Sequence, residues 1–158
     1  MTAATAARGP WTRAGLVLAG VLAADQIVKA LVAGSLERGE QRDLVAGVKL
    51  VNTRNTGVAF GQLQDGGVLV AVVIAIAIGA LLVYFGRHAR TPLMWLPTGM
   101  LLGGALGNIV DRIREGAVVD FLKLPHWPAF NVADAAITVG VVILLVVIER
   151  DDRARAST

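Results

Sequence analysis

The residues of this sequence that can do chemistry are mainly aspartates. Cysteine is absent, serine occurs only as Ser35 and Ser157, and histidine occurs only as His88 and His126. A catalytic triad needs a serine hydrogen-bonded to a histidine, and a zinc site needs several histidine or cysteine ligands. We therefore expect neither a triad nor a zinc site, and we interpret His126 as a loop residue at the membrane interface. Carboxylate chemistry is what remains.

Two aspartates are the preferred candidates for that chemistry. Asp120 lies in the apolar run VVDF (118–121), and Asp134 begins the last apolar stretch, so both are expected to be partly desolvated. Two carboxyl groups held close share a proton, so that one acts as base toward a water while the other acts as acid toward a carbonyl. Such a pair hydrolyses peptides without a metal. For Asp134 a structural alternative stays open, because Asn131 and an acid three residues later match a helix capping box.

Two other charged pairs have both functional and structural readings. Asp25 and Lys29 stand four apart and therefore share one helix face. Each charge near the bilayer centre costs at least about 2.5 to 3.5 kcal/mol, so such residues are usually functional, although a neutralised structural pair is an equal alternative here. Asp111 and Arg112 are interpreted as an interfacial ion pair that ties down the following loop.

The elements that position these residues are predicted to be membrane helices. The 158 residues are 55% hydrophobic and only 17% charged, which is typical of an integral membrane protein. Four apolar stretches approach the roughly 20 residues that cross a bilayer, at 14–34, 68–85, 93–110 and 132–148. We predict an all-α membrane protein with four transmembrane helices, forming a single domain over residues 1–158. The first stretch is not read as a cleaved leader, because charges interrupt it and three more stretches follow.

The distribution of basic residues predicts the orientation. Lys and Arg are denser in segments 1–13, 86–91 and 149–158 than in segments 35–67 and 111–131, which places both termini in the cytoplasm. The two longer segments then lie outside. Alternating residues around Val48 predict a short β-hairpin on the outer membrane surface, and the proline- and aromatic-rich segment 124–130 is expected to enter the headgroup layer. The net charge of +3 is scattered over short loops, so no nucleic-acid partner is expected.

Alternating helix directions bring the polar residues to one face of the membrane. The first helix ends after Lys29, Asn55 precedes the second, Asn108 lies near the end of the third, and Asp134 begins the fourth, so all of them are predicted on the outer side. Small residues spaced by four in the third helix predict close helix packing. They are Gly99, Gly103 and Gly107.

Five blocks of this sequence, in order, resemble the lipoprotein signal peptidases, also called signal peptidase II. The blocks are DQIVK (25–29), NTGVAF (55–60), GGALGNIVDR (103–112), VDF (119–121) and FNVAD (130–134). From the first block to the last they span about two-thirds of the chain, and the four predicted helices and the hairpin agree with the architecture of that family. The resemblance implies that Asp120 and Asp134 are the catalytic aspartates of a membrane endopeptidase that needs no cofactor or metal.

The resemblance also implies the substrate and the supporting residues. The substrate is a bacterial prolipoprotein whose cysteine carries a diacylglyceryl group, cut just before that cysteine, in the cytoplasmic (inner) membrane and with the active site near the outer face. Globomycin-type cyclic peptides would inhibit, and a monomer surrounded by membrane lipid is expected. The supporting positions, which orient the aspartates or hold the substrate, are Asp25, Lys29, Asn55, Gly57, Asn108, Asp111, Arg112, Asn131 and Ala133. The short interval between Asp120 and Asp134 departs from the family and puts in doubt how far a flap reaches over the site.

Two other classes compete with a peptidase. A small transporter would use Asp25 and Lys29 as a proton or cation site, but such sites lie near the bilayer midplane and often accompany repeat symmetry, neither of which this sequence shows. A non-catalytic scaffold would use the glycine-rich third helix for packing alone, and would leave the outer polar cluster unexplained.

Overall fold

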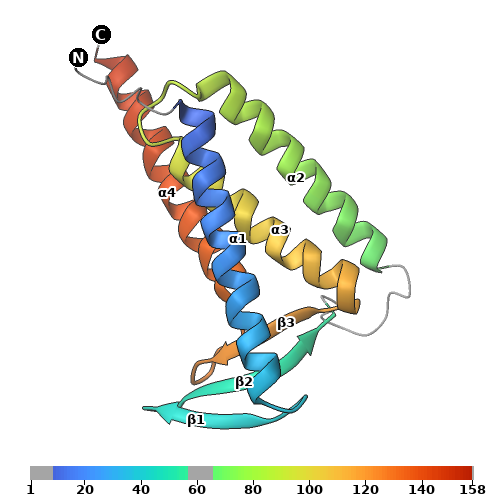
Figure 1. The fold of residues 1–158 in the computed structure, drawn as a ribbon. Coiled ribbons are helices and arrows are strands. Elements are labelled where there is room, and N and C mark those ends of the chain that lie inside the picture. The colour runs from blue at the N-terminus through green and yellow to red at the C-terminus, as the bar shows by residue number, and fades with distance from the viewer. Residues whose placement is uncertain (1–8, 57–65, 158) are drawn as a thin grey trace, which may run out of the picture.

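The computed structural model describes residues 9–56 and 66–157, with the side chains of residues 66–71 left out of the description. Seven elements follow one another: helix α1 (Pro10–Ser35), strands β1 (Gln41–Val45) and β2 (Val48–Asn55), helices α2 (Gly66–His88) and α3 (Trp95–Glu115), strand β3 (Val118–Lys123) and helix α4 (Val132–Ala156). The helices form a bundle, and the three strands lie at the end of the bundle away from both termini (Figure 1).

Two of the helices in the described ranges, α1 and α4, are both long and apolar enough to cross a membrane, with mean hydropathies of 1.9 and 2.4 over their most apolar windows. The described apolar part of α2 is shorter and covers Val72–His88. The second half of α3 carries several polar and charged side chains. Membrane crossing by α2 and α3 therefore stays a prediction.

Close packing of α1, α3 and α4 depends on glycines in α3, as the four-residue spacing predicts. A methyl group built on Gly99 would lie 2.6 Å from the carbonyl oxygen of Ala14 in α1, and one on Gly103 would lie 2.8 Å from that of Leu18. On another side of α3, a methyl group on Gly104 would lie 2.6 Å from the carbonyl oxygen of Ala133 in α4. The glycines thus let two neighbouring helix backbones approach α3, and this approach brings the polar ends of the three helices together.

The C-terminal end of α2 is anchored at the end of the bundle away from the sheet. Phe85 is fully buried in a cluster with Ala14, Met94 and Val147, and its ring packs edge-on against Trp11 with 4.6 Å between ring centroids. Helix α2 lies beside α3, on the outside of the bundle (Figure 1).

The predicted hairpin is present, but it belongs to a larger sheet. Strands β1 and β2 pair antiparallel, and β3 pairs antiparallel with the other edge of β2, so that Thr53 lies opposite Asp120 and Asn55 opposite Val118. The prediction of helices plus a hairpin between the first two was therefore incomplete, and Asp120 lies in a strand where a loop was expected. The physical reason is that β2 has a free edge, to which an apolar segment far along the chain can pair.

Helix α3 is longer than its apolar stretch. It continues to Glu115 and ends at Gly116, whose φ of 71° is the left-handed conformation that glycine adopts readily. Asp111 and Arg112 therefore lie inside the last turns of the helix, whereas the predicted apolar stretch ended just before them, at residue 110.

Candidate active site

Asp120 and Asp134 come together because a strand and a helix cap meet. The side chain of Asn131 is the N-cap of α4: its Oδ1 accepts a hydrogen bond of 2.9 Å from the backbone N–H of Asp134, while Asp134 accepts one from the N–H of Asn131. The amide Nδ2 of the same Asn131 donates to Oδ1 of Asp120 at 2.8 Å. The capping box proposed as a structural alternative is thus present, and the same asparagine connects it to the second carboxylate.

Two further asparagines each donate a hydrogen bond to one of the two carboxylates. Asn108 of α3 donates from Nδ2 to Oδ1 of Asp134 at 2.8 Å, and Asn55 of β2 donates from Nδ2 to Oδ2 of Asp120 at 3.0 Å. Asn131 also donates to Oδ1 of Asn108 at 3.1 Å. Each carboxylate oxygen therefore accepts an N–H, and both groups are held in fixed orientations without a cation.

The environment of Asp120 favours its protonated form. The residue is 2% exposed, and this burial raises the pKa of the carboxyl group above its ordinary value, as does the nearby negative charge of Asp134. The hydrogen bonds from Asn55 and Asn131 and the more distant charge of Lys29 oppose the rise without cancelling it. Asp134 is less buried and sits at a helix N-terminus, where the helix dipole favours negative charge.

A buried cluster of three charges contacts the residues that neighbour the two aspartates. Lys29 Nζ is 2.7 Å from Oδ2 of Asp25 and 2.7 Å from Oδ2 of Asp111, and the three residues are between 0% and 5% exposed. The predicted pair of Asp25 and Lys29 is present. The predicted pair of Asp111 and Arg112 was wrong: Asp111 faces Lys29 of α1, and Arg112 donates to the backbone carbonyl of Asn108 at 3.2 Å.

Each member of this charge cluster reaches a residue beside the aspartates. Asp25 Oδ1 accepts the backbone N–H of Ala133 at 2.9 Å, one residue before Asp134. Asp111 Oδ2 accepts the backbone N–H of Val119 at 3.0 Å, one residue before Asp120. The third member, Lys29, donates at 3.1 Å to Oδ1 of Asn108. The cluster therefore sets the positions of α4, β3 and Asn108 at once.

Two residues that contact this cluster, Gln26 and Gly107, were not predicted as site residues from the sequence. Gln26 Nε2 donates to Oδ1 of Asp111 at 2.9 Å and to Oδ2 of Asp25 at 3.2 Å, so it joins the two carboxylates as Lys29 does. Gly107 leaves room for Asp25, because a methyl group on it would lie 2.6 Å from Oδ2 of Asp25. Both stand inside the sequence blocks noted above, but their roles depend on contacts between helices that spacing does not reveal. The expected supporting residue Gly57 lies outside the described residues.

The groups that the neighbouring side chains turn toward the two carboxylates are not metal ligands. The neutral side chains that face the two carboxylates present amide N–H groups, which are hydrogen-bond donors and not metal ligands. Within residues 9–56 and 66–157, no group of three or more His, Cys, Asp or Glu side chains is placed to hold a metal ion. The described arrangement is suited to holding a proton and orienting a water.

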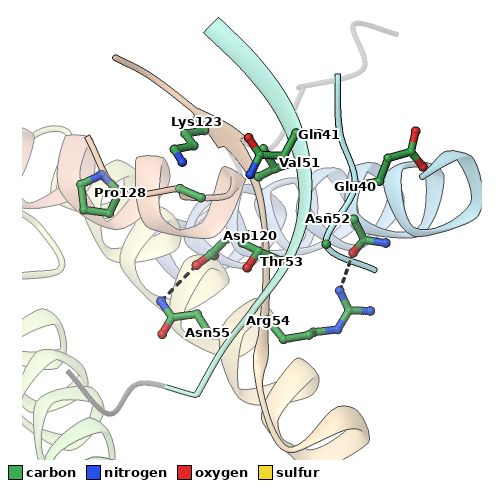
Figure 2. A pocket seen from close by; sticks show the side chains of 12 residues that line it. Glu40, Gln41, Val51, Asn52, Thr53, Arg54, Asn55, Asp120, Lys123 and Pro128 are labelled. Carbon is green, nitrogen blue, oxygen red and sulfur yellow. Dashed lines mark hydrogen bonds between the residues drawn. The ribbon is translucent and has the colours of Figure 1, made fainter. Parts of the chain in front are cut away.

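A polar groove of about 490 Å³ opens at Asp120. Strands β1 and β2 and the segment after β3 surround it, with Thr53 and Asn55 beside Asp120 and with Lys123 and Pro128 further away (Figure 2). The volume is within the range of about 300 to 1,000 Å³ that ligand pockets usually have. Asp120 thus forms part of the wall of this groove on the sheet side.

Comparisons with known proteins agree on one family. The sequence pattern of signal peptidase (SPase) II matches residues 17–149. The chain is 36% identical to a lipoprotein signal peptidase of Halothermothrix orenii, covering 84% of this chain and 92% of that protein. It is 42% identical to a lipoprotein signal peptidase of Brevibacillus brevis, covering 82% of this chain and 90% of that protein.

Solved structures give the same result for the fold. A bacterial membrane enzyme solved by the in meso method at 2.3 Å resolution superposes with a TM-score of 0.78 and 28% sequence identity, covering 88% of each chain. A second bacterial membrane enzyme, solved by the same method at 1.9 Å, superposes with a TM-score of 0.75 at 28% identity, covering 85% of this chain and 91% of the other.

Proposed function

The chain belongs to the signal peptidase II family and is a protease, and from this membership and the geometry of the site we propose that it is a membrane aspartyl endopeptidase that removes signal peptides from bacterial prolipoproteins. The proposed substrate carries a diacylglyceryl-modified cysteine and is cut just before that cysteine. The observation that carries the proposal is the linkage of Asp120 and Asp134 through the single side chain of Asn131, with every carboxylate oxygen accepting an N–H.

The environments of the two aspartates support different roles in the first step. Asp134, at the helix N-terminus, takes a proton from a water as the water oxygen attacks the scissile carbonyl carbon. Asp120, whose raised pKa favours the protonated form, donates its proton to the carbonyl oxygen, so that a neutral tetrahedral diol forms.

The second step returns both groups to their starting states. The carbon–nitrogen bond breaks, the leaving amine takes the proton from Asp134, and one hydroxyl of the diol returns a proton to Asp120. The products are the signal peptide with a free carboxyl group and the mature chain with a free amine on its cysteine. No group outside this chain, the substrate and water is needed to balance the reaction.

The supporting residues act by positioning. Asp25 and Asp111 hold the backbone next to each catalytic aspartate, and Lys29 holds these two carboxylates together. Asn55 and Asn108 orient the catalytic carboxylates themselves. For Arg112 and Gly57, the family resemblance supports a role in holding substrate.

The position of the site suits a substrate that is held in the bilayer. Strand β3, which carries Asp120, and the first turn of α4, which carries Asp134, lie at the end of the bundle away from both termini (Figure 1). The basic residues near the termini favour a cytoplasmic location for the opposite end. We therefore propose four membrane-spanning helices in one domain of the inner membrane, acting as a monomer, with the site near the outer face. A lipid-modified cysteine would then sit at the height of the aspartates.

Cleavage of a purified substrate tests this function. The protein in detergent micelles should convert a diacylglyceryl-modified prolipoprotein to two products, and mass spectrometry should place the new N-terminus at the modified cysteine. A globomycin-type cyclic peptide at saturation should stop the reaction. Cleavage at another bond, or equal cleavage of the unmodified precursor, would contradict the proposed specificity.

A further inference from the structure

The groove at Asp120 is lined by an ammonium group, that of Lys123, for which the described part of the chain offers no ion-pair partner. Four charged side chains line this groove. They are Glu40, Arg54, Asp120 and Lys123. Glu40 faces Arg42 at 3.5 Å, and Arg54 Nε is 2.5 Å from Glu115. Among the residues that the structure describes, no carboxylate lies within ion-pair distance of Lys123.

The groove extends from the catalytic end toward this lysine. Figure 2 shows Lys123 with Gln41 and Val51 at one end of the groove, while Asp120 lies nearer the other end, beside Thr53. Lys123 follows Asp120 by three residues on β3, which corresponds to about 10 Å along an extended strand. An extended peptide crosses the same distance in about three residues.

The direction of the substrate follows from its polarity. A signal peptide is apolar and stays beside the helices, whereas most residues that line the groove are polar and belong to the sheet or to the segments beside it. The sheet lies at the end of the bundle (Figure 1). The segment after the cut is therefore the part that suits this groove.

We propose that the groove binds the first residues of the mature chain, and that Lys123 favours an acidic side chain about three residues beyond the cut bond. This inference rests on the proposed function, because it assigns the groove to one side of the scissile bond. A lysine and a carboxylate about 4 Å apart in water gain roughly a fivefold change in an equilibrium constant, and salt weakens the gain. The preference is therefore one of rate and affinity among substrates, and not a requirement for cleavage.

The chain offers a matched control. Lys49 of β2 lies opposite Lys123 in the antiparallel register, so both contribute similar charge to this end of the sheet. Lys49 does not line the groove, and its ammonium is 3.4 Å from Oδ1 of Asp43. A general charge effect would depend on both lysines, whereas a groove contact would depend on Lys123 alone.

The experiment compares kcat/KM for prolipoproteins that differ only in having Asp, Gln or Lys at the second, third or fourth residue after the cysteine. The wild type should cut the best-placed Asp substrate at least about fivefold faster than its Lys counterpart at low salt, and less than twofold faster near 1 M salt, where the Debye length is about 3 Å. Lys123→Gln should remove the preference, and Lys123→Glu should invert it. Lys49→Gln, which removes a charge without placing a carboxylate opposite Lys123, should keep the preference of the wild type.

Three results would overturn the inference. The first is a wild type that cuts the Asp and Lys substrates equally while still cutting before the cysteine, which would leave the proposed function intact. The second is a loss of preference caused by Lys49→Gln that equals the loss caused by Lys123→Gln. The third is a Lys123→Glu variant that weakens all substrates alike in proportion to the anionic lipid in the micelle, which would assign Lys123 to the membrane surface. A wild type that cuts no substrate would overturn the proposed function as well.

Discussion

Replacing Lys29 with methionine should both destabilise the protein and displace its site. The ammonium of Lys29 lies 2.7 Å from a carboxylate oxygen of Asp25 and 2.7 Å from one of Asp111, and all three side chains are buried. Methionine has a similar length and no charge, so the change leaves two buried carboxylates facing each other without a cation. These carboxylates also hold the backbone N–H groups of Ala133 and Val119, next to the proposed catalytic aspartates.

The magnitude follows from the cost of an uncompensated buried charge. Removing one partner from a buried ion pair typically costs about 3 to 5 kcal/mol. For a chain of this size each 1 kcal/mol lowers the melting temperature by about 2 to 4 °C, so the expected decrease is about 6 to 20 °C. A displacement of the catalytic groups by about 1 Å can reduce turnover by about 10²-fold, and we expect a loss of that order.

Thermal unfolding and cleavage in the same detergent measure the two effects. Lys49→Met is the matched control, because Lys49 is partly exposed and its ion-pair partner among the described residues is the exposed Asp43. This change should alter stability by no more than about 0.5 kcal/mol and leave turnover unchanged. A Lys29→Met variant that melts within about 2 °C of the wild type and cuts at the wild-type rate would refute the positioning role of the charge cluster.

Three further changes test other contacts. Gly107→Ala should lower stability by about 1 to 3 kcal/mol in thermal unfolding, because the new methyl group would lie 2.6 Å from Oδ2 of Asp25, whereas Gly15→Ala, which meets no atom within 4 Å, should be neutral or stabilising. Asp120→Asn should gain melting temperature relative to the wild type as the pH rises from about 4 to 7, because the new NH2 group faces an amide donor of Asn55 or Asn131 at both pH values and only the carboxyl group titrates. Folding raises the pKa of that carboxyl group, so its favourable contribution is present below the unfolded pKa of about 4 and is lost as the pH rises through the folded value. Asn131→Ser should keep the helix cap and hence most of the stability, yet lower kcat at least about tenfold, because serine cannot also donate to Asp120; Asn131→Ala should cost about 1 kcal/mol more in unfolding.

The convergence of the polar residues could be predicted from the sequence. Alternating helix directions place the end of α1, the end of α3 and the start of α4 on one side, and the structure brings Lys29, Asn108 and Asp134 into one hydrogen-bonded network. The cap at Asn131 could also be predicted, because a capping box is a local pattern of four residues. The side on which a helix end lies and the presence of a local cap can therefore be predicted from the sequence.

Contacts between distant segments were not accessible in the same way. The partner of Asp111 is Lys29 on another helix, and nothing in the spacing distinguishes it from the neighbouring Arg112. The strand that carries Asp120 forms only because the edge of β2 is free to pair with it, and pairing of segments more than 60 residues apart leaves no short-range pattern. Both contacts help to position Asp120, because β3 carries this residue and Asp111 accepts the backbone N–H of Val119 next to it.

Helix ends also differ from the predicted stretches for an identifiable reason. Helix α4 continues beyond its apolar part to Ala156, where Arg153 and Arg155 pair with acids four residues before them. Helix α1 begins at Pro10, a residue that suits the first turn of a helix. Hydropathy predicts the part of a helix that is apolar enough to contact lipid. It does not predict the polar turns by which the same helix continues beyond that part.

The most direct test of the proposed dyad is cleavage of the diacylglyceryl-modified prolipoprotein by the purified wild type, Asp120→Asn and Asp134→Asn, each with a metal chelator present. Thermal unfolding of the three proteins confirms that all are folded. The proposed mechanism predicts that the wild type cuts before the modified cysteine despite the chelator, and that both folded variants lose at least about 10³-fold in kcat, because each lacks one of the two proton-transferring groups. Cleavage that survives either substitution, or that stops in the wild type when the chelator is added, would contradict a metal-free aspartate pair.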